Sequence, residues 1–307
     1  DMIRKALSRF GLKDKDDMAS DVESALADET LHYSRTGSRE LPMALADAIL
    51  ADGGRVLTSS PVTAIETSDG RVVRVSYRRN GADTTIDADF CISTIPLPVL
   101  PALLRPQAPD DVLRSSRALG FRPLVVYGLL VRRDRVLDAQ YIYFRDRVFH
   151  RVAEPKNSGL EVTPPDHTVL LVEMTCAIGD DRWNGGEETH RRIARDLAGA
   201  GLVDPDEIVE THVVRSEHGY PLFEIGFEPH FERIMEHVGG IDNLWTTGRQ
   251  GGFCYPNMHG AMRMGADAAE EVLSVGRHDP ETDQPWRPAA LDESGISLSD
   301  GDLAEEG

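Results

Sequence analysis

Residues 246–265, TTGRQGGFCYPNMHGAMRMG, read as the end of a strand, a glycine-rich loop and the start of a helix. Gly248 ends the strand predicted over 243–247, and Asn257 is well placed as the N-cap of a helix that begins at Met258. The first turn of such a helix has free backbone N–H groups and carries the positive end of the helix dipole. The stretch therefore predicts a strand, loop and helix that hold a negative or electron-rich group.

The glycines of this stretch allow two interpretations. Gly251, Gly252, Gly260 and Gly265 have no Cβ, so a backbone or a flat ring can approach them closely. In the alternative, the stretch is an ordinary connection in which Gly260 and Gly265 pack against a neighbouring strand. The residues alone leave both interpretations open.

Composition limits the partners that the protein can have. The 307 residues include 52 acidic and 33 basic side chains, and the net charge is −19. This charge argues against nucleic acid and anionic membrane surfaces, because both are bound through basic patches. Only four basic residues are lysines, which supports the hypothesis of a halophilic protein. A GC-rich genome combined with an acidic tail explains the same composition.

The cysteines and apolar runs indicate a cytoplasmic protein. Cys91, Cys176 and Cys254 lie far apart, without the paired spacing of disulfides or zinc sites. No apolar run reaches the roughly 18 residues that a membrane span needs. The first thirty residues are charged throughout and do not resemble a signal peptide. We therefore expect no membrane span and no bound metal.

Periodicity predicts alternating helices and sheets along the chain. A helix is expected over 40–54, with an apolar face formed by Leu41, Leu45, Ile49 and Leu50. Short strands follow over 55–79, with a hairpin turn at Asp69-Gly70, and another buried strand is expected over 84–100.

Three runs rich in aromatic and β-branched residues predict an antiparallel sheet over 121–176. We expect this sheet to cover the substrate through its aromatic residues Tyr127, Tyr141, Tyr143 and Phe149. Helices are expected over 187–201 and 227–240, with a strand over 206–216 between them.

The motifs resemble those of a flavoprotein superfamily. Gly248-Arg249, Phe253, Tyr255, Asn257 and Met258-His259 closely resemble the C-terminal flavin-binding motif of UDP-galactopyranose mutases and of their protoporphyrinogen-oxidase-like and amine-oxidase-like relatives. Further segments, in the same order, resemble other parts of these flavoproteins: Val62 with Ile65, the strand ending at Ser93 and Thr94, and Tyr220-Pro221. The resemblance covers residues 30–275. It implies an α/β (α+β) chain that is part of a glutathione-reductase-type FAD-binding fold with an antiparallel-sheet substrate domain.

The resemblance also implies roles for individual residues. FAD contacts are expected from Val62, Thr94, Gly248, Arg249, Asn257, Met258 and His259. Substrate contacts are expected from Tyr220, Tyr255 and Arg249. No catalytic side chain is identified, because the chemistry belongs to the flavin. The alternatives are a surface ion pair for Arg249, core packing for the two tyrosines, and a cap or surface position for His259.

The glycine-rich turn with which these flavoproteins begin, Gly-x-Gly-x-x-Gly, does not occur in the sequence. We therefore expect a fragment, one chain of a split enzyme, or a degenerate relative that no longer binds FAD. The predicted organisation is a helical lead-in over 1–30, a portion of the FAD domain over 31–105, a substrate-binding domain over 106–215, a C-terminal portion of the FAD domain with a flavin-facing helix over 216–275, and an acidic disordered tail over 276–307.

The leading functional hypothesis is an FAD-dependent oxidoreductase of the amine-oxidase-like type, which transfers hydride from a small-molecule substrate to flavin N5. One alternative is a sugar isomerase of the UDP-galactopyranose mutase type. Asn257 counts against it, since the mutases usually carry Asp at this position. Another alternative is a non-catalytic subunit of a two-chain flavoprotein, whose second chain carries the glycine-rich segment.

Overall fold

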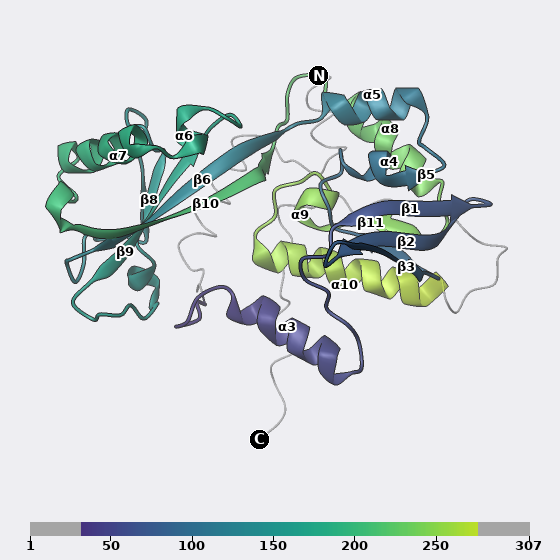
Figure 1. Cartoon of the computed structure of the whole chain (residues 1–307), viewed down its shortest axis with the longest axis horizontal. Coiled ribbons are helices and arrows are strands. Elements are labelled where there is room, and N and C mark those ends of the chain that lie inside the picture. Colours follow the sequence, from purple (N-terminus) through teal and green to yellow (C-terminus); the bar gives the residue numbers. More distant parts are fainter. Residues whose placement is uncertain (1–31, 276–307) are drawn as a thin grey trace, which may run out of the picture. The chain divides into compact units, whose positions relative to one another are not determined.

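The computed structural model describes residues 32–275. The predicted lead-in over 1–30 and the predicted tail over 276–307 lie outside this range. The described part contains three sheets, of four, five and two strands, with helices packed against them (Figure 1). None of the helices in this range is long and apolar enough to cross a membrane.

The four-stranded sheet has the order β3-β2-β1-β5. Its strands are β1 (Val62–Ser68), β2 (Arg71–Arg79), β3 (Ala82–Asp87) and β5 (Leu104–Arg105). The predicted hairpin at Asp69-Gly70 is confirmed: both residues have positive φ, 51° and 76°, as a two-residue hairpin turn requires.

The stretch 84–100, predicted to hold one buried strand, is divided among three elements, although a strand does end at Ser93 as predicted. This stretch contains β3, which is exposed along its whole length, then β4 (Cys91–Ser93) in a different sheet, and the start of α4 (Leu100–Leu103). β3 is the edge strand of the four-stranded sheet, and no described element covers either of its faces.

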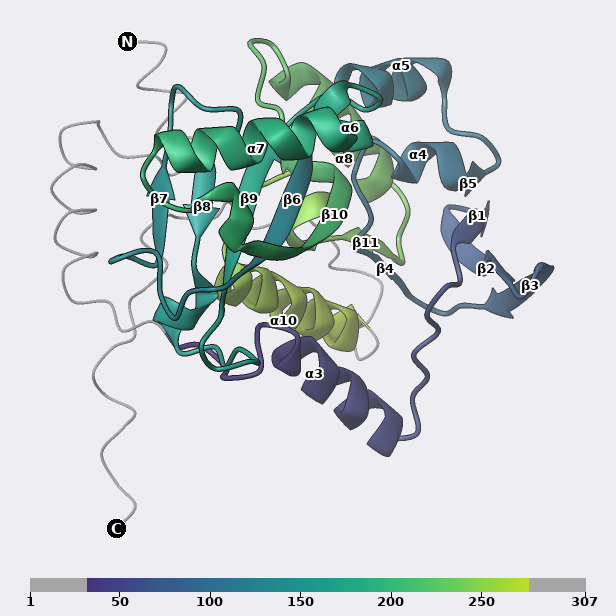
Figure 2. The same cartoon turned by 60° about the vertical axis from the view of Figure 1, so that its left-hand side comes forward.

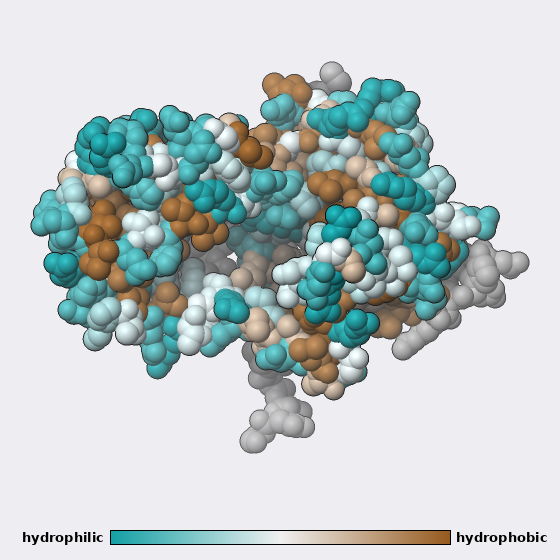
Figure 3. All heavy atoms as spheres, in the orientation of Figure 1, coloured by the Kyte–Doolittle hydropathy of each residue, from teal (hydrophilic) through white to brown (hydrophobic). Residues whose placement is uncertain are grey.

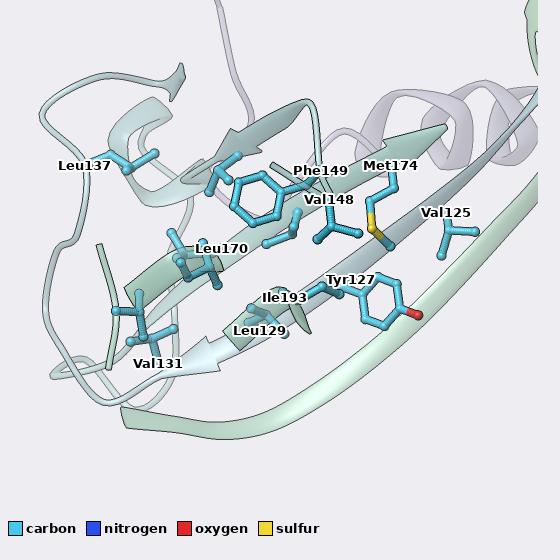
Figure 4. Packing of buried hydrophobic residues seen from close by; sticks show 14 of the residues in the cluster. Val125, Tyr127, Leu129, Val131, Leu137, Val148, Phe149, Leu170, Met174 and Ile193 are labelled. Carbon is cyan, nitrogen blue, oxygen red and sulfur yellow. The ribbon is translucent and has the colours of Figure 1, made fainter. Parts of the chain in front are cut away.

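The five-stranded antiparallel sheet has the order β10-β6-β9-β8-β7. Its strands are β6 (Phe121–Val131), β7 (Tyr141–Tyr143), β8 (Arg151–Ala153), β9 (Thr168–Thr175) and β10 (Ile208–Pro221). α7 (Glu187–Gly199) lies across one face of this sheet (Figure 2). Its Ile193 and Leu197 pack in a core with Tyr127, Phe149 and Leu170 (Figure 4).

Among the described residues, only one face of this sheet is fully covered. Along β6, buried and half-buried side chains alternate from Val125 to Val131, as expected for a sheet with one face in the core. Tyr127 and Phe149 lie on the core side, so their predicted role as substrate-covering aromatics is wrong. Tyr141 and Tyr143 lie at the edge and are 48% and 63% exposed.

The third sheet is a parallel pair formed by β4 and β11 (Leu244–Thr246). Near it, α5 (Asp110–Ala118) packs against α8 (Glu228–Gly239), and both contribute to a second core. The remaining helices are α6 (Asp181–Asn184), α9 (Gly248–Gly251), α10 (Met258–Val275), η1 (Pro155–Ser158) and η2 (Pro205–Glu207).

The predicted domain boundaries stay a prediction, and two observations bear on them. Val112 and Leu113 of α5 belong to the second core together with Ile65 and Val238. β10 continues from Ile208 through Pro221 as one strand of the five-stranded sheet. α5, which lies inside the predicted substrate-binding domain, therefore packs in the core of the predicted FAD-domain portions, and β10 runs across the boundary predicted between 215 and 216.

The helix predicted over 40–54 forms as α3 (Glu40–Ala51), but it buries none of its side chains in the described structure. Its apolar face is exposed, with Leu45, Ile49 and Leu50 each about half accessible. Apolar spheres over this helix are visible at the lower edge of Figure 3. The amphipathic pattern is therefore present without a covering element in residues 32–275.

Adjacent leucines on β9 provide a test of this arrangement. Leu170 is fully buried in the core, whereas Leu171 lies on the open face and is 36% exposed. We expect Leu170→Ala to lower the free energy of unfolding by about 2–5 kcal/mol, because it leaves a cavity. Leu171→Ala is the matched control and should cost much less. Denaturant unfolding measures both, and equal losses would contradict the assignment of the two faces.

Candidate functional site

The predicted strand, loop and helix are present between β11 and α10. α10 begins at Met258, and the N–H of Ala261 donates to the carbonyl of Asn257 at 3.0 Å. The amides that precede this first helical bond are not used within the helix. Asn257, Met258 and His259 are all exposed, so the N-terminus of α10 is open.

The glycines of the loop are required by the protein's own backbone. A Cβ on Gly251 would lie 2.9 Å from Thr246 Oγ1 and 3.0 Å from the carbonyl oxygen of Ser93. A Cβ on Gly252 would lie 2.9 Å from the carbonyl oxygen of Gly248. At Gly251 the loop therefore packs against the end of β4, and at Gly252 it packs against its own backbone. Gly265, in contrast, has open space at its Cβ position.

Arg249 joins the loop to the end of β10. Its guanidinium carbon lies 4.0 Å from the centre of the Tyr255 ring and 5.4 Å from that of Tyr220. Its two terminal nitrogens donate to the carbonyls of Pro256 at 3.2 Å and Gly219 at 3.5 Å. No carboxylate pairs with Arg249 within the described range. The three predicted substrate residues therefore form one stacked group.

The other predicted residues are divided between two places. Thr94 lies beside Gly248, whose Cβ position would be 4.0 Å from its methyl carbon. Ser93, next to it, has a buried hydroxyl without a hydrogen-bond partner among the described residues. Val62 opens β1 and pairs with Tyr77 in the four-stranded sheet. Val62 is therefore not part of the loop neighbourhood.

A buried carboxylate that the motifs did not indicate completes this neighbourhood. Glu173 of β9 has a side chain only 8% exposed. It accepts hydrogen bonds from His150 at 3.1 Å, from Arg151 and from the hydroxyl of Tyr220 at 2.5 Å. The sequence signal was a single carboxylate inside the apolar run HTVLLVEMTC. An acidic residue in a buried strand needs partners, which makes it a candidate for a functional role.

These contacts perturb the protonation of both groups. Burial by itself raises the pKa of Glu173, but the hydrogen bonds from His150, Tyr220 and Arg151 outweigh it and bring the pKa to about 2. The pKa of Tyr220 is raised above its usual value by burial, by its hydrogen bond to Glu173 and by Tyr255. At neutral pH Glu173 is therefore ionised and Tyr220 is protonated.

Comparison with protein families gives one match over most of the chain. The model of the flavin-containing amine oxidoreductases matches residues 6–273. This match confirms the predicted family and the predicted class of cofactor. No protein of curated function matches the chain by sequence.

Comparison with solved structures confirms the predicted fold class. A reduced UDP-galactopyranose mutase matches with a TM-score of 0.62 at 18% identity, covering 77% of this chain and 50% of that one. A protein from Exiguobacterium sp. 255-15 assigned as a protoporphyrinogen oxidase matches with a TM-score of 0.58 at 18% identity, covering 79% of this chain and 51% of that one. Cyclohexylamine oxidase from Brevibacterium oxydans matches with a TM-score of 0.59 at 15% identity, covering 79% of this chain and 53% of that one. The chain spans about half the length of these structures.

The loop glycines allow a matched test of the packing at the site. Gly251→Ala should destabilise the protein by about 1–3 kcal/mol, because its Cβ would collide with Thr246 and the backbone of Ser93. Gly265→Ala, in the open part of α10, should be neutral or stabilise by up to about 1 kcal/mol through helix propensity. Denaturant unfolding measures the free energy of unfolding of both variants. A Gly251→Ala variant as stable as the wild type would refute the close backbone approach.

The lowered pKa of Glu173 predicts a pH dependence of stability. Because its pKa is lower in the folded state than the ordinary value of 4.5, the ionised group stabilises the fold above that pH, and this stabilisation is lost as the pH falls toward about 2. Glu173→Gln removes the titrating group. Urea unfolding between these pH values should therefore show a smaller loss of stability in the variant than in the wild type, and identical slopes would contradict the assignment.

Proposed function

The chain belongs to the flavin-containing amine oxidoreductase family, and we propose that it forms the flavin-covering and substrate-binding part of an FAD-dependent oxidoreductase. The observation that carries this proposal is the open N-terminus of α10 beside the stack of Arg249 on Tyr255. When bound, the flavin would accept a hydride at N5 from a small-molecule substrate. The residues of this chain would bind and orient both molecules and exclude water.

Two features of the described residues suit a flavin at this place. The first turn of α10 offers free amides and the positive end of the helix dipole, which would stabilise the negative N1–C2=O edge of reduced flavin. Ser93, at the end of β4 beside the loop, has a buried hydroxyl that lacks a partner within residues 32–275. Both features support a polar ligand between β4 and α10.

The proposal assigns contacts to the residues that the motifs indicated. Cofactor contacts are assigned to Val62, Thr94, Gly248, Arg249, Asn257, Met258 and His259. Substrate contacts are assigned to Tyr220, Tyr255 and Arg249. The stacking of Arg249 with both tyrosines supports a single recognition surface made from the loop and the end of β10.

A further α/β segment would complete the cofactor site. Within residues 32–275, β4 and β11 form a parallel pair of two strands, with Ile92 42% exposed, and α3 buries no side chain. Parallel sheets in proteins are normally covered on both faces. These open surfaces support a nucleotide-binding segment that packs against them. If a second chain supplies it, the protein is one half of a split enzyme or a non-catalytic subunit of it.

A sugar isomerase of the UDP-galactopyranose mutase type is the second candidate. The likeness of fold supports it, and Asn257 counts against it, since mutases usually carry Asp there. An isomerase needs no net oxidant. Turnover of UDP-galactofuranose without an electron acceptor would therefore identify this alternative.

Visible absorbance of the purified protein tests the flavin proposal. The chain would be expressed in high salt, with and without a segment that carries the glycine-rich nucleotide-binding turn, and desalted after addition of FAD. We expect flavin bands that resist desalting in the sample with the added segment. Bands in the chain alone would mean that it completes the site without that segment.

Two arginine variants, one at the loop and one elsewhere on the surface, provide the controls for this experiment. Arg249→Ala should lower the bound flavin, because it removes the group that holds the loop against β10. Arg233→Ala breaks ion pairs with Asp111 and Glu236 on the surface and should leave the flavin unchanged. A colourless protein in every sample would overturn the flavoenzyme proposal.

A further inference from the structure

The open face of the five-stranded sheet carries two exposed tyrosines at its β7 edge. Tyr141 and Tyr143 are separated by one residue, so both side chains leave the strand on the same face. Both are exposed, and their ring centres lie 5.5 Å apart in an edge-to-face arrangement. Aromatic rings attract one another in edge-to-face and offset arrangements. The pair therefore offers a partner for a third aromatic ring.

Strand register places these tyrosines in line with the candidate site. Tyr143 pairs with Arg151 on β8, and Arg151 pairs with Glu173 on β9. Side chains paired in register lie on the same side of a sheet, so the three residues form one row across the open face. β7, β8 and β9 are neighbouring strands (Figure 2), and each step between strands is about 4.8 Å. The backbone of Tyr143 therefore lies about 10 Å from that of Glu173.

Side-chain contacts continue along this row into the stacked group of the candidate site. Arg151 donates through Nε to Glu173 at 3.0 Å and through a terminal nitrogen to the Tyr143 hydroxyl at 3.5 Å. Glu173 also accepts a hydrogen bond from Tyr220 at 2.5 Å. The centre of the Tyr220 ring lies 5.2 Å from that of Tyr255. Direct contacts therefore join the β7 edge to the candidate site.

Arg151 contacts both edge tyrosines without adding a net charge beside them. Its guanidinium carbon lies 5.8 Å from the ring centre of Tyr141 and 5.9 Å from that of Tyr143, within the range of a cation–π contact. Its charge is paired with the buried carboxylate of Glu173. The ion pair is therefore balanced, and the surface next to it is aromatic.

The neighbouring row on the same face is apolar. Tyr141 pairs with Ala153 on β8, and Ala153 pairs with Leu171 on β9. Leu171 is exposed and Ala153 is half-buried. The short side chain of Ala153 lies between two larger ones. An aromatic ring would therefore find an apolar surface beside Tyr141.

We propose that Tyr141, Tyr143 and Leu171 bind an aromatic ring at the far end of an elongated substrate, whose reacting end lies at the candidate site. The part that concerns the substrate rests on the proposed function, whereas binding of the ring needs no flavin. The contacts that run from β7 to the stacked group support one continuous binding surface. The balanced ion pair beside the ring favours a ring without a charge of its own.

Fluorine NMR of fluorobenzene tests the ring site in this chain without flavin, because the probe has neither a charge nor a hydrogen-bond donor. We expect the wild type to broaden the fluorine signal. Tyr143→Ala should remove most of this broadening, whereas Tyr143→Phe should keep it because the ring remains. Val214→Ala is the control, since Val214 is an exposed apolar residue on β10, at the opposite edge of the same face. Equal broadening by the wild type and Tyr143→Ala would overturn the proposal.

A second variant and a second sample keep this test decisive. Tyr141→Ala removes the other ring and should also reduce the broadening, so the result does not depend on one variant that folds. The measurement would then be repeated with the added segment that carries the glycine-rich turn. Persistence of the broadening is expected. Its loss would show that the segment covers the tyrosines, and would overturn a ligand site at this edge.

Two linked rings test the connection between the edge and the candidate site. A phenyl and a fluorophenyl ring would be joined by ethylene glycol linkers of increasing length. We expect the tightest binding at one linker length, about tenfold tighter than that of the single ring, because a linker of the right span lets both ends bind at once. Tyr255→Ala should remove this maximum and leave the binding of fluorobenzene unchanged.

The same series contains the result that would refute the connection. Affinity that does not depend on linker length would overturn the assignment of the ring site to an elongated substrate. Failure of the flavin absorbance experiment alone would leave the fluorobenzene result standing. The proposed function and the ring site therefore fail separately.

Discussion

The end of β4 and the loop after β11 meet backbone to backbone, and the candidate site depends on this contact. Thr247 donates its N–H to the carbonyl of Ser93 at 2.9 Å, and Leu97 donates to the carbonyl of Gln250 at 3.0 Å. Such an approach leaves no room for a Cβ at Gly251. The contact fixes the start of α9, and through it the direction in which Arg249 leaves the loop.

A second set of interactions connects this loop to the five-stranded sheet. Arg249 reaches the carbonyl of Gly219 and Gln250 reaches that of His218, both near the end of β10. Glu173 then holds Tyr220 from the adjacent part of the sheet. Hydrogen bonds therefore join side chains far apart in the sequence into one surface.

The same fold leaves apolar surface uncovered. α3 has an apolar face without a partner in the described residues, and the parallel pair of β4 and β11 ends at two strands. The core of the five-stranded sheet, in contrast, is closed by α7 on one side. Contiguous exposed apolar faces often mark interaction surfaces in folded proteins. Within residues 32–275, the five-stranded sheet therefore has a closed core on one face, whereas α3 and the pair of β4 and β11 keep exposed apolar side chains.

The sequence by itself determined the local elements and the family. Glycine and asparagine placed the turn at Asp69-Gly70 and the start of α10, because these depend on backbone preferences of a few adjacent residues. The ordered motifs identified the flavoprotein family and predicted that Arg249, Tyr220 and Tyr255 contact the substrate. Only the tertiary structure decided that Tyr127 is buried whereas Tyr141 is exposed, that α3 has no covering element within residues 32–275, and that Glu173 binds Tyr220. Periodicity predicts that a helix has an apolar face but does not identify the element that covers it. Glu173 and Tyr220 are 47 residues apart in the sequence, and they meet because β9 and β10 both pair with β6.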